Sequence, residues 1–600
     1  MLLRRTLVPL LVAFVATAPV LAAPTTKSAS APNAPMTTTD AKWRQPLQGA
    51  PAALHVLNRL AFGPTPGQVE EVQAVGVRRW IETQLRPDAI DDSALENKLA
   101  VFQLIRSDPA KLSLMYRGDN GPVQKFLQMQ AGGRKKERLE AVAAQNAANG
   151  VMPADPNAKP SRLNRVLNER QQQTLDDFQA AGMRPGISVV TAGQLVQAKL
   201  IRAVESKRQL QEVLTDFWSN HFNIDMRKKS GRTLKVLDDR EVIRLHLFGS
   251  FRELLEASAH SPAMLEYLDN ARSTVEVKTR AGKTRGGLNE NYARELMELH
   301  TLGVDGGYTQ KDVTEVARCF TGWSVDAESA QFAFRPRTHD NGEKVVLGKT
   351  IAANGGQRDG EQVLDMLASS PSTARFLSGK LCQRFVADEP PAALVEHVAG
   401  VWMQTKGDLS SVYRALFLSP EFLSQGAYRA KIKSPFEYTV SAVRALGGQV
   451  SALDANSPLE ALRLRQIGAL SANQNAANKV GTRGEAKAPL AVRVAALGQP
   501  IFACQPPTGW SENSSAWVSA GAIVGRLNFA LALTNGTIGD VRLSADTFRP
   551  APVDALGKQL VGGQLSDATR ATIAKETGTV PTDGAKMRAL ILGSPEFQRR

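Results

Sequence analysis

Two glutamates and a histidine stand close together between residues 289 and 323. Glu295 and Glu298 are three residues apart, so on a helix both carboxylates share one side. Such a pair can act as general acid and base or bind a metal, and His300 adds a further base or ligand. The same positions also suit ion pairs on a solvated helix, with His300 as a buried structural residue beside Leu296. Both interpretations stay open at this stage.

The apolar pattern predicts that a helical hairpin positions this group. Tyr292, Leu296 and Leu299 have the spacing of the stripe that an amphipathic helix buries. Gly303 is suited to a left-handed helix end, and Thr309 begins a second helix with the spacing of a capping box. Three polar residues are expected near the glycine-rich turn as ligand-binding candidates: Asn291, Asp305 and Tyr308.

Histidines are concentrated in the same part of the chain. Five of the seven lie within residues 221–339, which favours a site. His221 belongs to the sequence FWSNHF and shares a helical stripe with Phe217, which instead favours a buried, hydrogen-bonded histidine. His339 and Asp340 occupy a turn, where side chains are free to face a ligand. Since no metal-ligand spacing such as HExxH occurs, any metal or other cofactor stays unknown.

The sequence QPPTGWSENSSAW, from Gln505 to Trp517, is a proline-rich loop that carries two tryptophans. Trp510 is a candidate ligand-binding residue, because its ring can stack on a sugar together with Trp517. The alternative is that these rings fix the loop to the core.

Helix signals dominate the rest of the chain. Ser-Pro recurs six times ahead of apolar-periodic runs, where serine caps the helix and proline fits its first turn. Strand-like alternation is limited to one small β-hairpin, residues 331–335 paired with residues 344–347 across the HDNG turn. The expected fold is therefore mainly α, a multi-helix globular protein.

The chain divides into an export signal, a linker and a long helical part. Residues 1–22 combine Arg4 and Arg5 with an apolar run too short to span a membrane and a small-residue cleavage pattern at Ala22, so the mature protein is expected in the periplasm or outside the cell. The other expected segments are a flexible linker at 23–50, a helical domain at 51–535 with polar insertions at 125–186 and 471–489, and a C-terminal helical segment at 536–600.

Charge and cysteine content narrow the functional classes. The net charge is +15, but the positive residues are spread along the chain and lack interleaved aromatics, which argues against nucleic-acid binding. A basic exported protein is attracted to an anionic envelope polymer. Three cysteines without redox or zinc spacing exclude a disulfide scaffold, and Cys319 is expected to be buried.

Four motifs together resemble the bacterial family known as domain of unknown function 1800 (DUF1800). They are NENYARELMELHTLGVDGGYTQ from Asn289, FWSNHF from Phe217, HDNGEKVVLG from His339 and QPPTGW from Gln505. The resemblance runs from about Leu54 to Phe529. It implies an exported, largely helical protein without an assigned reaction, and a co-encoded exported sulfatase-like protein as a partner. Many relatives carry a second histidine where this chain has Ser219, which weakens any metal site built on FWSNHF.

Two classes of function follow from these features. The first is a cell-envelope or extracellular binding or assembly protein. The second is a hydrolase, metal-dependent or not, that acts on an envelope or extracellular polymer with Glu295, Glu298, His300 and His221 as its chemical group. Because the chain has no nucleophile elbow and no zinc signature, the binding or assembly protein is preferred.

Overall fold

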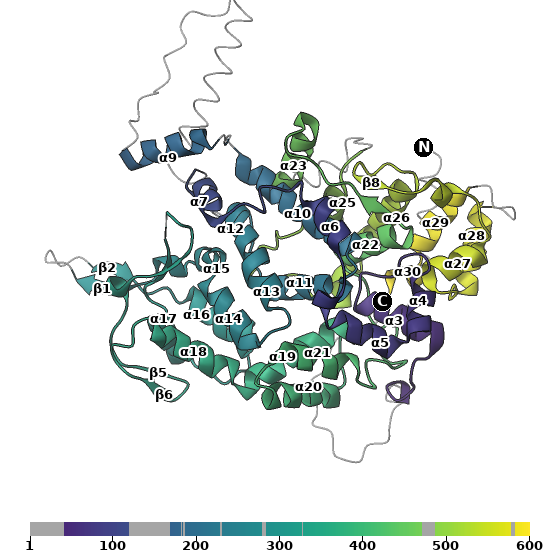
Figure 1. The fold of residues 1–600 in the computed structure, drawn as a ribbon. Coiled ribbons are helices and arrows are strands. Elements are labelled where there is room, and N and C mark those ends of the chain that lie inside the picture. Colours follow the sequence, from purple (N-terminus) through teal and green to yellow (C-terminus); the bar gives the residue numbers. More distant parts are fainter. Residues whose placement is uncertain are drawn as a thin grey trace, which may run out of the picture.

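The structure is a computed structural model that describes residues 41–118, 169–181, 183, 186–228, 231–278, 284–326, 328–470, 487–577 and 583–600. Helices make up most of it, and the strands form small two-stranded antiparallel sheets (Figure 1). The expected mainly α fold is therefore confirmed.

The first half of the chain contains the long helix α10 and several shorter helices. They are α3 (Gly49–Arg59), α4 (Gln68–Val75), α5 (Val77–Gln84), α6 (Ser93–Leu99), α7 (Pro109–Gly118), α9 (Glu169–Ala180), α10 (Ile187–Glu205), α11 (Gln209–His221), α12 (Gly231–Leu237), α13 (Arg244–His246), α14 (Phe251–His260) and α15 (Pro262–Tyr267).

The remaining helices include α19, which contributes residues to the site described below. They are α16 (Asn291–Glu295), α17 (Gln310–Cys319), α18 (Arg358–Ala368), α19 (Pro371–Phe385), α20 (Ala392–Gln404), α21 (Leu409–Phe417), α22 (Pro435–Ala445), α23 (Pro458–Leu470), α25 (Leu490–Ala496), α26 (Ala520–Thr534), α27 (Val553–Val561), α28 (Asp567–Thr577), α29 (Gly584–Gly593) and α30 (Pro595–Gln598).

Helix α10 packs against α11, α12, α22, α23 and α25. Most of its residues are buried because the sequence is apolar or small on nearly every side. It crosses α23 in backbone contact: a Cβ on Gly193 would lie 2.1 Å from the carbonyl oxygen of Leu464, and one on Gly468 would lie 1.9 Å from that of Val189. Glycine at both positions therefore permits the crossing.

The predicted β-hairpin has the wrong strand pairing. Strand β4 (Phe332–Phe334) pairs with β3 (Trp323–Val325), and β5 (Lys344–Val346) pairs with β6 (Lys349–Ile351). Leu347 and Gly348 form a two-residue turn in which both φ angles are positive, 50° and 75°, and this geometry matches the twist of antiparallel strands. Each strand thus pairs with its nearer neighbour along the chain. The other two sheets join β1 (Thr274–Lys278) to β2 (Thr284–Gly287) and β7 (Gln449–Val450) to β8 (Val541–Arg542).

Some of the segments predicted from the sequence lie wholly or partly outside the described residues. This holds for the signal peptide at 1–22, for residues 23–40 of the linker, and for residues 125–168 and 471–486 of the insertions. Residues 41–50 of the predicted linker are in contact with the folded part, since the Leu47 amide donates to Leu423 at 2.8 Å and the Gln425 amide donates to Gln45 at 2.8 Å. Within the described part, no helix is long and apolar enough to span a membrane.

The core continues from the long helical part into the C-terminal helices. Helix α26 packs against α29, and both contribute to one buried apolar cluster that also includes residues of α3 and α10. All three cysteines, Cys319, Cys382 and Cys504, are free thiols inside this core. The expected burial of Cys319 is confirmed, and burial raises the pKa of its thiol to about 12.

Candidate functional site

The predicted hairpin helix is a short α-helix, α16, that continues into a π-helical turn at Leu296–Thr301. The Thr301 hydroxyl donates to the Leu296 carbonyl at 2.7 Å, five residues back. Because a π turn inserts one residue, the buried stripe continues through Met297 and His300, whereas Leu299 is only partly buried. The expected place of Leu299 in the stripe is therefore wrong, and His300 has taken it.

Glu295, Glu298 and Tyr308 lie together on the half-buried side of this element. The Tyr308 hydroxyl donates to Glu298 Oε2 at 3.4 Å. Burial, and then the charge of Glu298, raises the pKa of the Glu295 carboxyl. Asn291 and Asp305 are exposed, so the three polar residues expected near the turn do not converge on one point.

His339 and Asp340 are engaged with other parts of the chain. His339 is 3% exposed, with Nδ1 2.8 Å from the Thr321 carbonyl oxygen and Nε2 3.1 Å from Asp359. Asp340 accepts from the Arg318 guanidinium at 2.8 Å. None of these residues lines the cavity described below.

His221 and His300 are brought together, and Lys380 joins them. The two rings are 6.0 Å apart, and His221 Nε2 lies 3.1 Å from the His300 carbonyl oxygen. Lys380 Nζ lies 3.1 Å from His221 Nδ1. An ammonium can only donate, so Nδ1 is the acceptor and Nε2 carries the proton that it donates to His300. His221 is thus a neutral imidazole with both nitrogens occupied.

Burial and the Lys380 charge keep both histidines neutral. Burial, then Lys380, lowers the pKa of His221 well below its ordinary value and that of His300 to about 3. Burial also lowers the pKa of Lys380 to about 8, although the negative charge of Glu512 acts in the opposite direction and raises this pKa. Lys380, rather than either histidine, is therefore the group of this trio that changes protonation near neutral pH.

The FWSNHF and QPPTGW motifs bind each other directly. The Asn220 amide donates to the Trp510 carbonyl at 2.9 Å, and the Trp510 amide donates back to Asn220 Oδ1 at 2.7 Å. Asn223 donates to the carbonyls of Cys504 and Pro506 at 3.0 and 2.8 Å. A Cβ on Gly509 would lie 2.3 Å from the Asn220 carbonyl oxygen, so only glycine permits this approach.

A cavity of about 300 Å³ opens between these elements, and we call it the Lys380 cavity. Helix α11 contributes one wall, α19 the second, and the loop of residues 508–513 the third. Its lining is mostly polar: Phe217, Asn220, His221, Lys380, Gln383, Thr508, Gly509, Trp510, Ser511, Glu512 and Asn513. Trp510 is half-exposed at this wall, and its ring lies 6.2 Å from that of Trp517.

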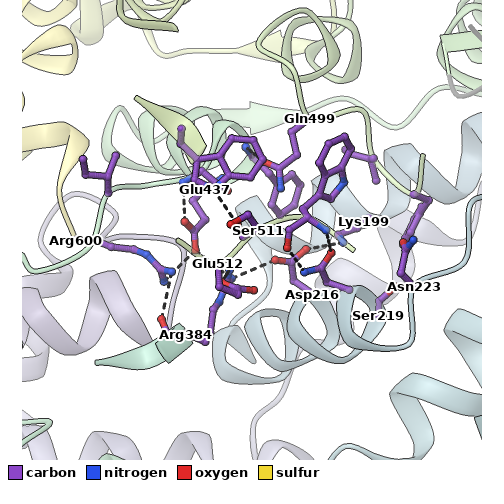
Figure 2. A pocket seen from close by; sticks show the side chains of 18 residues that line it. Lys199, Asp216, Ser219, Asn223, Arg384, Glu437, Gln499, Ser511, Glu512 and Arg600 are labelled. Atoms are coloured by element: carbon purple, nitrogen blue, oxygen red, sulfur yellow. Dashed lines mark hydrogen bonds and ion pairs between the residues drawn. The ribbon is translucent and has the colours of Figure 1, made fainter. Parts of the chain in front are cut away.

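A smaller hollow of about 40 Å³, the ion-pair chamber, is drawn in Figure 2. It shares Asn220 and the Trp510–Glu512 segment with the cavity. Arg384 is its centre. The guanidinium contacts Asp216 at 3.1 Å, Glu437 at 3.0 Å and Glu512 at 3.1 Å, and Arg600 contacts Glu437 at 2.9 Å. Burial alone would raise the pKa of Glu437, but Arg384 and Arg600 lower it to about 2. The chamber is thus a self-compensated ion network that supports the loop.

In the described part of the chain, no group of three or more His, Cys, Asp or Glu side chains is arranged to hold a metal ion. What the Lys380 cavity offers instead is an ammonium, carboxamides and an aromatic ring. These groups recognise polar organic ligands by hydrogen bonding and stacking.

Several of the lining residues were not expected from the sequence. Lys380 and Gln383 of α19 and Glu512 and Asn513 of the loop line the cavity, and Arg384 of α19 lines the ion-pair chamber. A signal was present in α19, because Lys380 and Arg384 are four residues apart and therefore share a face of the helix. Of the expected residues, His221 and Trp510 meet at the cavity, whereas Glu295, Glu298 and His300 do not line it.

Comparison with known proteins finds no matching curated protein and no matching solved structure. A family model described as a protein of unknown function (DUF1800) matches residues 55–599, nearly the whole chain. The chain therefore belongs to the DUF1800 family.

Proposed function

We propose that this is an exported binding protein of the cell envelope or the extracellular space, and that the Lys380 cavity holds a segment of a saccharide polymer. The observation that carries the proposal is the convergence of Trp510 with Lys380, Gln383 and Asn513 around about 300 Å³ of open space. The export signal expected from residues 1–22 supports the location.

The lining has the mixture of groups that sugars require. An indole ring packs on the apolar face of a sugar, while carboxamides and charged groups bond its hydroxyls. Gln383 donates to Asn513 at 2.9 Å, so within the described part of the chain the Gln383 oxygen and the Asn513 amide group are left to bond a ligand. A cavity of this size holds a ligand rather than a single water, because one water needs only about 10–15 Å³.

The loop is held in place before any ligand arrives. Asn220 and Asn223 fix it by hydrogen bonds to main-chain atoms, and Arg384 fixes Glu512. A rigid loop reduces the entropy lost on binding. This arrangement supports a binding role for the two motifs.

A hydrolase acting on such a polymer is the second candidate, and one observation favours it. Lys380 combines a lowered pKa of about 8 with a place in the cavity beside His221, which is the pattern of a general acid or base. Release of new reducing ends from a bound polymer, lost in Lys380→Met, would establish this candidate instead.

Affinity electrophoresis of the purified protein in gels that contain neutral and acidic polysaccharides tests the proposal. We expect retardation by at least one polymer, weakened about tenfold in Trp510→Ala because the ring is removed while the main-chain bonds to Asn220 remain. Trp43→Ala is the matched control, since Trp43 is another half-buried tryptophan but packs on Gly426 away from the cavity. Equal retardation of Trp510→Ala and wild type, or no retardation by any polymer, would contradict the proposal.

A further inference from the structure

Half-buried Lys380 has no carboxylate partner among the described residues, unlike most buried and half-buried lysines in that part of the chain. Four of them pair closely: Lys199 with Asp216, Lys235 with Asp238, Lys344 with Asp359 and Lys431 with Asp388. Among the described residues, no carboxylate oxygen lies within 4.0 Å of Lys380 Nζ, whose contacts are His221 Nδ1 at 3.1 Å and the Phe376 ring at 5.6 Å.

Lys433 is the nearest comparison, and it has a different environment. Its ammonium lies 3.9 Å from the centre of the Phe597 ring. The hollows that it lines hold only about 10 Å³ each, room for about one water. Lys380 instead faces about 300 Å³. Of the two lysines, only Lys380 has space beside it for a ligand.

The groups around Lys380 leave its charge only partly compensated. His221 on α11 and His300 on the π turn are neutral, since burial and then Lys380 lower the pKa of each. Glu512 on the loop is the carboxylate that lines the same cavity, and it is bound to Arg384 at 3.1 Å. An ammonium has three donors and His221 accepts one, so two remain for a ligand.

We propose that the Lys380 cavity selects acidic saccharides, and that Lys380 is the specificity residue that binds an oxyanion group carried on the sugar. This inference rests on the proposed function, because it names the class of saccharide that the same cavity takes. His221 acts as a positioning residue: its Nδ1 accepts one ammonium proton and directs the remaining two toward the cavity. The formal charge of +15 adds a long-range attraction for an acidic polymer.

The oxyanion is a carboxylate, as in a uronic acid, or a sulfate or phosphate ester. Each of these accepts charge-assisted hydrogen bonds from an ammonium. Binding requires the protonated lysine, so affinity for the acidic ligand should fall as the pH rises through and above about 8. The titrating groups near it, His221 and His300, stay neutral over this range, because burial and then Lys380 lower the pKa of each. Glu512 is paired with Arg384 at 3.1 Å.

The test compares each acidic polymer with its neutral counterpart by isothermal titration calorimetry on the full chain. Polygalacturonate, alginate and hyaluronate are paired with their methyl esters, and dextran sulfate is paired with dextran. We expect at least one acidic member to bind about tenfold or more tightly than its counterpart, which is the scale of a hydrogen bond to a charged group. Preference within the uronate pairs identifies a carboxylate, and preference within the dextran pair identifies a sulfate.

Lys380→Met should lose that preference, and Lys380→Arg should retain part of it. Lys349→Met is the matched control, because it removes the same charge from an exposed strand and leaves the cavity intact. Equal binding of acidic and neutral members by the wild type, or an unchanged preference in Lys380→Met, would overturn the inference and leave the proposed function standing. Absence of binding to every polymer would overturn both.

Discussion

Asn220 and Trp510 hold each other by two hydrogen bonds of 2.9 and 2.7 Å, although they are 290 residues apart in the chain. The Asn220 carboxamide satisfies both the amide and the carbonyl of Trp510, as a neighbouring strand would. The indole ring takes no part in these bonds, and Trp510 lines both the Lys380 cavity and the ion-pair chamber. One asparagine therefore determines where the proposed stacking surface lies.

Asn220→Ala should destabilise the protein and weaken saccharide binding. It leaves the main-chain amide and carbonyl of Trp510 without these partners, which costs about 1–3 kcal/mol when such groups stay out of water. Urea denaturation gives the loss of stability, and the polysaccharide gel assay gives the loss of binding. Asn456→Ala is the control, because Asn456 is exposed and bonds to the nearby Asp454; a similar loss there would show that the effect is not specific to the loop.

Gly509→Ala should be more damaging than Gly348→Ala. Both glycines have left-handed backbones, with φ of 73° and 75°, so alanine costs each about 1–2 kcal/mol. At Gly348 the new Cβ has open space, whereas at Gly509 it would lie 2.3 Å from the Asn220 carbonyl oxygen. The excess loss of stability at Gly509, measured by thermal unfolding, therefore reports the collision. Equal losses would mean that the two motifs separate without cost.

Glu437→Gln should lower the free energy of unfolding by about 3–5 kcal/mol at pH 7, since it leaves Arg384 and Arg600 buried with less compensating charge. The exposed pair of Glu396 with Arg375 is the control, and Glu396→Gln should cost under about 1 kcal/mol. Since the folded-state pKa of Glu437 is about 2 and lies below its unfolded value, its stabilisation is present above the unfolded pKa and is lost as the pH falls toward 2. The difference between variant and wild type should shrink over that acidic range, and a constant difference would contradict the ionic origin.

Glu295→Gln combined with Glu298→Gln should leave the melting temperature unchanged or raised at pH 7. The folded-state pKa of Glu295 is raised by burial and then by Glu298, so ionisation above that pKa disfavours the folded state. The advantage of the double variant should therefore grow as the pH rises through the carboxyl range and vanish where both carboxyls are protonated. A lower melting temperature would show that the carboxylates bind partners that the fold needs.

Local sequence signals predicted most of the capped helix starts for physical reasons, although Ser419 and Pro420 begin no helix. Ser434, with a proline after it, caps its helix as expected and forms a capping box with Glu437. Thr309 forms the expected capping box with Asp312. These bonds join residues three positions apart, so spacing alone determines them. The π turn after α16 has no such local signature, and it placed His300 rather than Leu299 in the core.

The site was only half predictable, because it is assembled from distant segments. His221 and Trp510 stood out by residue type, and they meet at the cavity. Nothing local in the sequence indicated that α19 would bring Lys380 to His221, 159 residues away. The hairpin pairing was wrong for a related reason: His339 leaves the HDNG turn to contact Thr321 and Asp359 in the interior, so that turn does not join two strands.

Hydrogen–deuterium exchange with and without the tightest-binding oligosaccharide tests the central claim most directly. We expect ligand-dependent protection in two places, the loop of residues 508–513 and helix α19 around Lys380, with no change in the β5–β6 hairpin. Both responding segments line the cavity, so protection in them together places the ligand there. Protection confined to the Glu295 and Tyr308 region, or to any surface away from the cavity, would contradict the account.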